Sequence, residues 1–400
     1  MKFSVLLPTR NRLEYLKYAV ETVRRQDYDD WEVIISDNCS EEDIKGYVQS
    51  LGDARIKYFR TDEFIPVTDN WNNALENSSG DYIIMLGDDD CLMKGYFRTV
   101  YDLINEYQQP DFIYTSAFLY VYPGVYAGSP DGYLQPYGYA SFLKLVSNEK
   151  PYLLDKPQAL ELVKQFMNFR VLYGFNMQFS IISRKFISSL KDKGPFFQSP
   201  FPDYYATNVM FLKAERILIC PYPLVTIGVT PKSYGFYHFN NREAEGIEFL
   251  KTLPDPQSAL KLQRVLLPGS NINTSWLFSI EAIKANYGAE FDIQANYRRY
   301  RLLQISHVFE QYYATKSMSK EDMDAFWKRM RLSEKITYGT GLLTLLTLKR
   351  LVSQGRREWL YKKLKSGLKQ FPEWDAEKNE RNYNNILDVF EQVNPLQATH

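Results

Sequence analysis

The chain has few cysteines and histidines, no long apolar run and no net charge. Cys39, Cys91 and Cys220 are an odd number without paired spacing, so a disulfide framework and a zinc cage are both excluded and a reducing compartment is expected. No apolar stretch reaches the roughly 18 residues needed to cross a bilayer, and the apolar run at the start is too short for a signal peptide. We therefore expect a cytoplasmic protein.

The balance of charge limits the partners that the protein can have. Lysine and arginine number 48, as do aspartate and glutamate, so no overall field attracts nucleic acid and we expect no nucleic-acid partner. Hydrophobic residues make up 45% of the 400 residues, which is ample for a folded core and leaves room for two or three domains.

The first ninety residues alternate between short apolar runs and amphipathic segments. Apolar runs with β-branched or aromatic residues predict strands, and apolar residues at helical spacing predict helices. The predicted strands are residues 3–7, 31–35, 56–59 and 82–86, and the predicted helices are residues 13–23 and 69–76. This order predicts a mostly parallel sheet with right-handed crossovers.

The rest of the chain is less regular. Residues 112–142 are rich in tyrosine and turn formers, and we interpret them as loops and short strands over one end of the sheet. A strand at 178–183 and a helix at 203–213 follow. Pro254 and Pro256 mark the best domain boundary, since two prolines in three residues block both helix and central strand. Beyond them the pattern is helical, with Ser319 as the N-cap of one helix.

The strand at 82–86 leads into three consecutive carboxylates, Asp88, Asp89 and Asp90. Ligands gather at the carboxyl ends of strands in open α/β sheets, and hard oxygen ligands suit Mg²⁺ or Mn²⁺, which also bind diphosphate oxygens. The alternative is a solvated acidic turn in which Asp90 caps the next helix.

Polar residues also follow the first two strands, in Pro8-Thr9-Arg10-Asn11-Arg12 and Ser36-Asp37-Asn38-Cys39-Ser40, and Asn72 lies on the helix before the acidic strand. Together with the carboxylates, this arrangement resembles family 2 of the glycosyltransferases, closely over residues 3–93 and more loosely to about residue 240. The resemblance implies an α/β fold of the GT-A type: a mostly parallel sheet flanked by helices, followed by a smaller, mainly helical C-terminal domain. The expected domains are a catalytic domain at 1–250, with a nucleotide-sugar-binding half at 1–110 and an acceptor-binding half at 111–250, and a helical domain at 257–400.

The resemblance also assigns roles to single residues. It implies that Pro8, Thr9 and Arg10 line the nucleotide pocket and that Asp37 accepts a hydrogen bond from the base. It places Asn72 and Asp88 beside the nucleotide sugar and makes Asp89 the first choice for a metal ligand, with Asp90 as a further one. Many members carry aspartate where this chain has Gly87, which leaves open which of the three carboxylates binds the ion.

Two later residues are candidates for chemistry. Asp203 falls where such enzymes place a catalytic carboxylate, and an inverting transfer needs a base that takes a proton from the acceptor hydroxyl. We favour the catalytic role; the alternative is that Asp203 is only an N-cap, because a proline-flanked aspartate before a helix is common. His238 is a candidate metal ligand, although a lone histidine among aromatics is more often a packed side chain.

Two clusters have both a functional and a structural interpretation. Aromatic residues between 114 and 139 can stack on sugar rings of the acceptor or pack in the core; they are Tyr114, Phe118, Tyr120, Tyr122, Tyr126, Tyr133, Tyr137 and Tyr139. Residues 349–369 contain eight basic side chains and one acid, which predicts an amphipathic helix that lies on an anionic membrane or is simply solvated.

These features lead to a function hypothesis: an inverting glycosyltransferase that moves a sugar from a nucleoside-diphosphate donor, expected to be UDP-linked, to a hydroxyl of a glycan or lipid-linked acceptor with Mn²⁺ or Mg²⁺. A nucleotidyltransferase of related fold and a non-catalytic binding protein stay open as alternatives. No Gly-x-Gly-x-x-Gly follows a strand, so a dinucleotide oxidoreductase is disfavoured. Peripheral membrane contact through residues 349–369 and homo-oligomerisation are further expectations.

Overall fold

The computed structural model describes residues 1–125, 132–137, 145–233, 265–268, 272–315, 317–338 and 383–395. Within them, ten strands form one sheet in the order β3-β2-β1-β4-β9-β6-β10-β5, with β7 paired to β6 and β8 to β10. The strands are β1 (Phe3–Thr9), β2 (Trp31–Asp37), β3 (Ile56–Arg60), β4 (Tyr82–Met85), β5 (Cys91–Leu92), β6 (Phe112–Val121), β7 (Tyr133–Pro136), β8 (Tyr152–Leu154), β9 (Ser180–Ser183) and β10 (Ile217–Val229).

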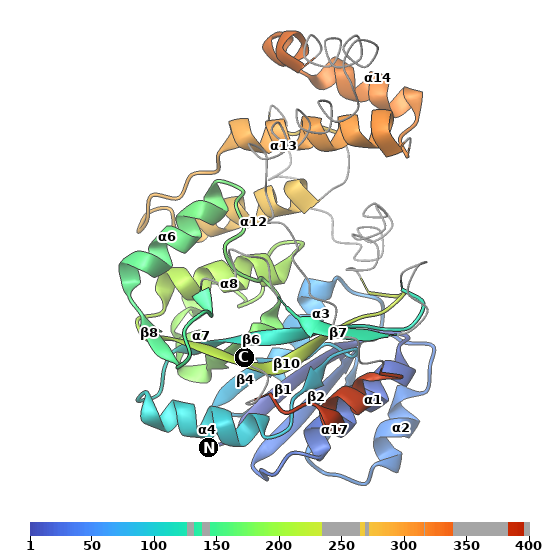
Figure 1. Ribbon diagram of the computed structural model, residues 1–400, viewed down its shortest axis with the longest axis vertical. Helices are drawn as coiled ribbons and strands as arrows, with labels where there is room; N and C mark the ends of the chain where they lie inside the picture. The colour runs from blue at the N-terminus through green and yellow to red at the C-terminus, as the bar shows by residue number, and fades with distance from the viewer. Residues whose placement is uncertain are drawn as a thin grey trace.

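Helices cover both sides of this sheet (Figure 1). In that view α1, α4 and α17 lie below it, α6, α8 and α12 lie above it, and α13 and α14 stack further up the long axis. The α-helices are α1 (Leu13–Arg24), α2 (Ile44–Ser50), α3 (Val67–Glu76), α4 (Tyr96–Glu106), α6 (Lys156–Met167), α7 (Arg184–Ser189), α8 (Pro202–Lys213), α12 (Ile272–Tyr287), α13 (Tyr297–Phe309), α14 (Lys320–Arg329) and α17 (Ile386–Gln392). Short 3₁₀ turns occur at Met177–Phe179 and Lys191–Lys193, and one π-helical turn follows α13 at Glu310–Thr315.

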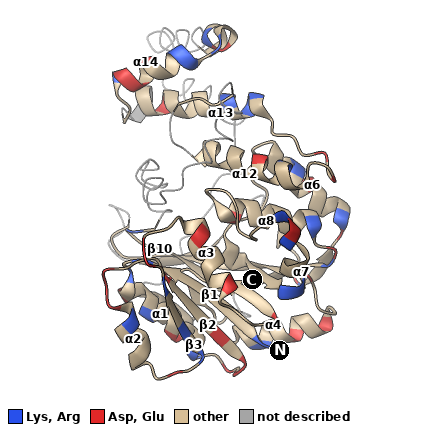
Figure 2. Ribbon diagram, turned by 180° about the vertical axis from the view of Figure 1, so that it is seen from behind, with Lys and Arg blue, Asp and Glu red and all other residues tan. Residues whose placement is uncertain are grey.

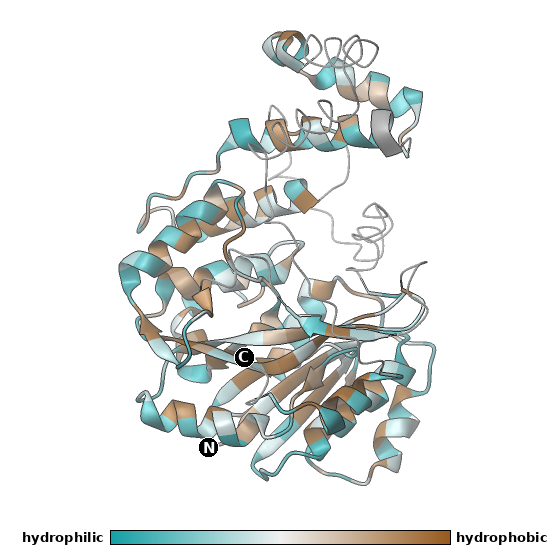
Figure 3. Cartoon of the chain, in the orientation of Figure 1, coloured by the Kyte–Doolittle hydropathy of each residue, from teal (hydrophilic) through white to brown (hydrophobic). Residues whose placement is uncertain are grey.

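The first four strands are parallel, as the sequence predicts. β1 pairs in parallel with β2 and β4, and β2 pairs in parallel with β3. The apolar face of α1 packs on this sheet, with Leu16, Ala19, Val20 and Val23 all fully buried. Figure 3 shows the strands as the most hydrophobic layer, with hydrophilic residues on the outer sides of the helices. The predicted fold class is therefore confirmed, although β9 introduces antiparallel pairing with β4 and β6.

The prediction of loops and short strands at 112–142 is wrong for its first part. Residues 112–121 form the ten-residue strand β6, of which nine residues are buried, and β6 pairs with β7, β9 and β10. A strand covered on both faces has a nearly continuous apolar and aromatic sequence rather than an alternating one. The turn formers Pro123 and Gly124 come only after this strand has ended.

The C-terminal part is helical in α12, α13 and α14, as predicted. Ser319 is the N-cap of α14, and its hydroxyl accepts a hydrogen bond from the backbone N–H of Asp322 at 3.0 Å. Trp276 of α12 stacks on Phe166 of α6 with ring centroids 5.0 Å apart, so α12 joins the core that covers the sheet. The expected boundary at Pro254 lies outside the described residues, and the division into domains stays a prediction.

Figure 2 shows basic and acidic residues interspersed along the described ribbon, consistent with the balanced composition. None of the helices in the described ranges is both long and apolar enough to pass through a bilayer.

Candidate functional site at the carboxyl edge of the sheet

The carboxyl ends of the parallel strands bring the predicted residues together. Thr9, the last residue of β1, lies opposite Asp37, the last residue of β2, in the parallel register. Asp88 and Asp89 lie in the turn that follows the neighbouring strand β4. The Thr9 hydroxyl donates a hydrogen bond to Oδ2 of Asp88 at 2.7 Å. Residues from three strand ends therefore meet at one edge of the sheet.

Arg12 connects these residues, although the sequence analysis gave it no role. One guanidinium nitrogen lies 2.7 Å from Oδ1 of Asp88, and the other donates to Oδ2 of Asp89 and to the hydroxyl of Thr230. Asn11, with φ at 52°, adopts the left-handed conformation that asparagine tolerates and turns the chain between Arg10 and Arg12. The signal for Arg12 was present in the sequence as a second arginine after the first strand.

Burial and charge shift the pKa values of this group. Burial raises the pKa of Asp88, Arg12 opposes that rise, and Asp89 adds to it. Burial alone would lower the pKa of Arg12, but Asp88 and Asp89 outweigh it and hold the pKa above its usual value. Arg12 therefore stays charged, and it compensates part of the negative charge that two neighbouring carboxylates bring into a buried site.

The Asp90 carboxylate is fully used in hydrogen bonds within the protein. Its carboxylate accepts hydrogen bonds from the backbone N–H of Gly87 at 2.8 Å, the backbone N–H of Gly228 at 2.8 Å and the amide of Gln178 at 2.7 Å. A side chain at position 87 would run into the Asp90 carboxylate, so Gly87 leaves room for this turn. Both Asp90 oxygens are used inside the protein, where they brace the turn that carries Asp88 and Asp89.

Asp89 is the carboxylate that best fits a divalent ion. Its Oδ2 accepts hydrogen bonds from Arg12 and Thr230, whereas its Oδ1 receives none from the described residues. Within those residues no group of three His, Cys, Asp or Glu side chains is arranged as a metal cage. A site with one carboxylate that is completed by phosphate oxygens and water is the arrangement that Mg²⁺ commonly uses. The donor set fits that arrangement.

Asp37 and Arg10 form a second part of the same edge. The buried Asp37 carboxylate accepts hydrogen bonds from the backbone N–H of Ser40 at 2.9 Å, the Tyr58 hydroxyl at 2.7 Å and the Arg60 guanidinium at 3.2 Å. The Arg10 guanidinium lies 4.0 Å from the centroid of the Phe64 ring. Pro8 precedes Thr9 in β1, so all three residues predicted to line the nucleotide pocket lie at this edge.

Asn72 holds a loop. Its amide nitrogen donates to the carbonyl of Phe197 at 2.9 Å, and its amide oxygen accepts from the backbone N–H of Phe197 at 3.1 Å. Thr68, in the first turn of α3, donates to the carbonyl of Ser199 at 2.7 Å. These contacts fasten α3 to the loop that leads into α8, and they give Asn72 a function that does not require contact with a nucleotide.

Asp203 lies four residues after Ser199, in the first turn of α8. The N-cap residue of α8 is Phe201, so Asp203 is not the N-cap that the structural interpretation expected. Its Oδ1 accepts a hydrogen bond from the backbone N–H of Tyr204 at 3.0 Å. Burial raises the pKa of Asp203 to about 7, against the opposing effect of that hydrogen bond. A carboxyl group with this pKa takes up and releases protons near neutral pH.

The structure separates the aromatic cluster into two groups. Tyr114, Phe118, Tyr120 and Tyr122 lie in β6 or directly after it and are buried in the core. Tyr133 and Tyr137 are only partly buried. Tyr126 and Tyr139, like His238 and the basic residues 349–369, lie outside the described residues.

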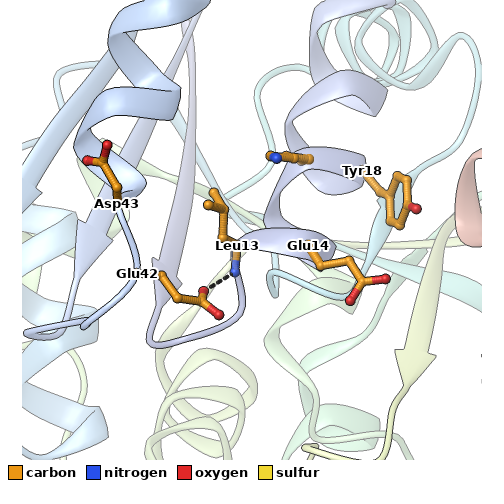
Figure 4. Close-up of a pocket in the computed structure, with 6 residues that line it drawn as sticks. Leu13, Glu14, Tyr18, Glu42 and Asp43 are labelled. Atoms are coloured by element: carbon orange, nitrogen blue, oxygen red, sulfur yellow. Dashed lines mark hydrogen bonds between the residues drawn. The ribbon is translucent and has the colours of Figure 1, made fainter.

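A separate hollow of about 580 Å³ lies between the start of α1 and the loop before α2. Its lining includes Glu14, Glu42 and Asp43, and the Glu42 carboxylate accepts a hydrogen bond from the backbone N–H of Leu13 (Figure 4). None of the predicted site residues lines this hollow, and its three carboxylates outnumber its one cation, Lys17, so the net negative charge would disfavour a diphosphate.

The N-terminal part of the chain matches a known protein family. Residues 4–144 match the family model described as glycosyl transferase family 2. This N-terminal part of the chain is a family 2 glycosyltransferase domain, and the resemblance found in the sequence is confirmed.

Two curated relatives align with the same region. A protein of Campylobacter jejuni named GalNAc(5)-diNAcBac-PP-undecaprenol beta-1,3-glucosyltransferase is 40% identical over 108 residues, which are 26% of this chain and 35% of that protein. The putative colanic acid biosynthesis glycosyl transferase WcaA of Escherichia coli K12 is 39% identical over 89 residues, 22% of this chain and 32% of the relative. The chain thus spans about a third of the length of these relatives. A crystal structure of S. aureus TarS in complex with UDP-GlcNAc superposes with a TM-score of 0.46 at 14% identity, covering 82% of this chain and 79% of that one.

Proposed function

We propose that the protein is an inverting glycosyltransferase that moves a sugar from a nucleoside-diphosphate donor, UDP-linked, to a hydroxyl group of a glycan or lipid-linked acceptor. One observation carries the proposal: Thr9, Asp88, Arg12 and Asp89 form one connected set at the carboxyl edge of the sheet, beside Asp37. This is the edge at which ligands bind in open α/β folds.

The nucleotide is assigned to the part of the edge formed by Pro8, Thr9, Arg10 and Asp37. Asp37 would accept a hydrogen bond from the base through Oδ1, because this oxygen has two lone pairs and accepts one hydrogen bond from Ser40, whereas Oδ2 already accepts from both Tyr58 and Arg60. Arg10, stacked on Phe64, presents a positive charge and a flat surface beside it. These features favour a planar, anionic ligand such as a nucleotide.

The diphosphate is assigned to the turn after β4. Asp89 would hold Mn²⁺ or Mg²⁺ through its Oδ1, with Asp88 beside the donor. The ion would neutralise negative charge on the diphosphate leaving group. Arg12 adds a fixed guanidinium at the same place, where it can donate to phosphate oxygens.

Asp203 is assigned as the base. A carboxylate removes a proton from the acceptor hydroxyl most effectively when its pKa lies close to the working pH, and the pKa of Asp203 is about 7. The contacts from Thr68 and Asn72 keep the loop before Asp203 at the carboxyl edge, because α3 begins at that edge after β3. His238 stays a prediction as a metal ligand, and a comparison of metal binding by the unchanged protein and by His238→Ala would test it.

The proposed acceptor class is based on the names of two relatives. The Campylobacter protein is named for an undecaprenol-linked glycan, and the Escherichia coli protein for colanic acid biosynthesis. We extend this to a glycan or lipid-linked acceptor in polysaccharide or cell-envelope biosynthesis. Peripheral attachment at the inner face of a membrane through residues 349–369 is part of the proposal, and co-sedimentation with anionic liposomes tests it.

The proposal is tested by incubating the protein with a panel of UDP-sugars and Mn²⁺ and measuring the release of UDP. We expect release with one or a few sugars and loss of release in Asp89→Asn, with Asp29→Asn as a control because Asp29 is fully exposed on the opposite end of β2. Release of inorganic pyrophosphate from nucleoside triphosphates would indicate a nucleotidyltransferase instead. Donor binding in a thermal-shift assay with no turnover for any acceptor would indicate a binding protein.

A further inference from the structure

Arg12 occupies the space between the two carboxylates that are proposed to face a metal ion and the diphosphate. Its guanidinium contacts Asp88 at 2.7 Å and also contacts Asp89, and it donates to Thr230 at 2.7 Å. The Nε atom of Arg12 is buried and has no hydrogen-bond partner among the residues that the structure describes. The protein therefore already holds a cation at this position, with one donor group left unused.

The charges at this position decide what else can bind there. Arg12 is charged at any physiological pH, and its side chain is only 12% exposed. A divalent ion on Oδ1 of Asp89 would lie near this guanidinium, because Oδ2 of the same carboxylate already pairs with it. Two like charges a few ångströms apart in a buried site repel each other strongly. The ion pair thus disfavours a metal ion that arrives alone.

A nucleoside diphosphate changes this balance because it brings several negative charges and new acceptors. Arginine binds phosphate oxygens in a bidentate manner, and Arg12 has an unused Nε in addition to its paired nitrogens. Tyr15 lies under the guanidinium, with 5.4 Å between Cζ and the ring centroid, and supports a cation at this place whether or not the carboxylates hold it.

We propose that Arg12 is an internal counter-cation that makes divalent-metal binding conditional on the diphosphate of the donor. In the free protein it pairs with Asp88 and Asp89 and weakens metal binding. In the presence of the diphosphate its charge is shared with phosphate oxygens, and the metal ion and nucleotide bind with positive coupling. The inference rests on the proposed function because it takes a nucleoside diphosphate as the ligand of this edge.

The test is a titration of Mn²⁺, followed by electron paramagnetic resonance of the free ion, with and without UDP. For the unchanged protein we expect UDP to tighten Mn²⁺ binding about tenfold or more, within the usual range of coupling between two ligands. In Arg12→Met, which removes the charge but keeps a long side chain, we expect Mn²⁺ alone to bind about tenfold more tightly and the effect of UDP to shrink. Arg12→Lys keeps a charge and should bind Mn²⁺ alone as weakly as the unchanged protein.

Lys232→Met is the matched control. Lys232 lies close to the loop that contains Arg12 and donates a hydrogen bond to the carbonyl of Asn11 at 3.1 Å. Lys232 forms no ion pair with a carboxylate of the described residues. The Lys232→Met variant should bind Mn²⁺ in the absence of UDP with the same affinity as the unchanged protein. Circular dichroism melts of all variants identify any that fail to fold, and the titration of the unchanged protein with and without UDP needs no variant.

The possible results separate this inference from the proposed function. Equal Mn²⁺ affinity with and without UDP, when UDP itself binds, would overturn the role of Arg12 and leave the transferase proposal standing. If no nucleotide binds, the proposed function fails, and the affinity of Arg12→Met for Mn²⁺ alone still decides whether Arg12 excludes the ion. An unchanged affinity in that variant would overturn the inference in either case.

Discussion

The raised pKa of Asp203 has one consequence for catalysis and another for stability. A base with a pKa of about 7 is half protonated at neutral pH, so kcat/KM should fall about tenfold for each pH unit below 7 and level off above it. A pH profile of UDP release between pH 5 and 9 measures this. A profile that is flat through pH 7 would show that another group acts as the base.

The effect of pH on stability runs opposite to its effect on catalysis: the stability contributed by Asp203 decreases as the pH rises. The folded-state pKa of Asp203 lies above the ordinary value near 3.9, so its contribution to stability is fully present below that value and is lost as the pH rises through about 7. We expect Asp203→Asn to stabilise the fold at pH 8 by about 1–2 kcal/mol, to gain less at pH 5, and to lose at least about 100-fold in turnover. Thermal melts at both pH values test this, with the exposed Asp192→Asn as control. An equal gain at both pH values would contradict it.

Glu32 is a buried charge at the opposite end of the sheet from the site. Its carboxylate pairs with Lys2 at 2.8 Å and Lys57 at 2.7 Å and accepts a hydrogen bond from Ser4 at 2.7 Å. Burial alone would raise the pKa of Glu32, but Lys2 and Lys57 outweigh it and hold the pKa well below its usual range. This stabilisation is present above the unfolded-state pKa of about 4.3 and is lost as the pH falls below it.

We therefore expect Glu32→Gln to destabilise the protein at pH 7 by about 1–3 kcal/mol, and the difference to narrow below about pH 4. Urea unfolding at pH 7 and pH 3.5 measures both values. Glu21→Gln is the control, because Glu21 forms only surface pairs with Arg24 and Arg25. A difference that stays constant with pH would mean that the charge of Glu32 does not matter.

The position of Arg12 shows what sequence reasoning misses at the scale of a residue. Arg10 and Arg12 are identical side chains two positions apart, and the resemblance pointed to Arg10. Which of them faces Asp88 depends on the backbone angle of Asn11, which is a property of the folded loop. The positions of Thr9 and Asp89 were predictable because Thr9 ends a strand and Asp89 lies in the turn after one, and strand ends follow from apolar runs in the sequence.

At the scale of elements, α3 and the loop before α8 act as one unit through Asn72. Asn72→Ala removes both hydrogen bonds to Phe197, and we expect a loss of about 1–2 kcal/mol in stability. Because that loop leads into the first turn of α8, which contains Asp203, kcat should fall while KM for the donor stays near its original value. Steady-state kinetics distinguish this role from direct donor binding, in which KM would rise. Glu76→Ala, an exposed change on the same helix, should alter neither constant.

The strands show how far the fold followed from the sequence. β1 to β4 were predictable because short apolar runs with turn formers on either side alternate with helical patterns. β6 was not, because its aromatic residues and the turn formers after it match loops as well as strands. Its central place depends on pairing with β9 and β10, which lie about 60 or more residues further along the chain.

At the scale of the whole molecule, the end of the chain returns to its beginning. α17, which lies beside α1 in Figure 1, buries Ile386, Val389 and Phe390, and Tyr120 donates to the carbonyl of Tyr383 at 2.7 Å. We expect Val389→Ala to destabilise the protein by about 1–3 kcal/mol, as for other truncations of a buried aliphatic side chain.

Chemical unfolding monitored by circular dichroism tests this. The control is Glu391→Ala, which removes only an exposed ion pair with Arg25 and should cost less than about 1 kcal/mol. Equal effects of the two substitutions would show that α17 adds little to the N-terminal part.

Gly228 is where the second half of the sheet meets the turn with the carboxylates. A Cβ atom at this position would overlap the carbonyl oxygen of Asp89, and the backbone N–H of Gly228 donates to Asp90. The residue at this position of β10 is therefore constrained by the turn that contains Asp88, Asp89 and Asp90. A library that randomises β10 and is selected for turnover should return many residue types at most positions but only glycine at 228.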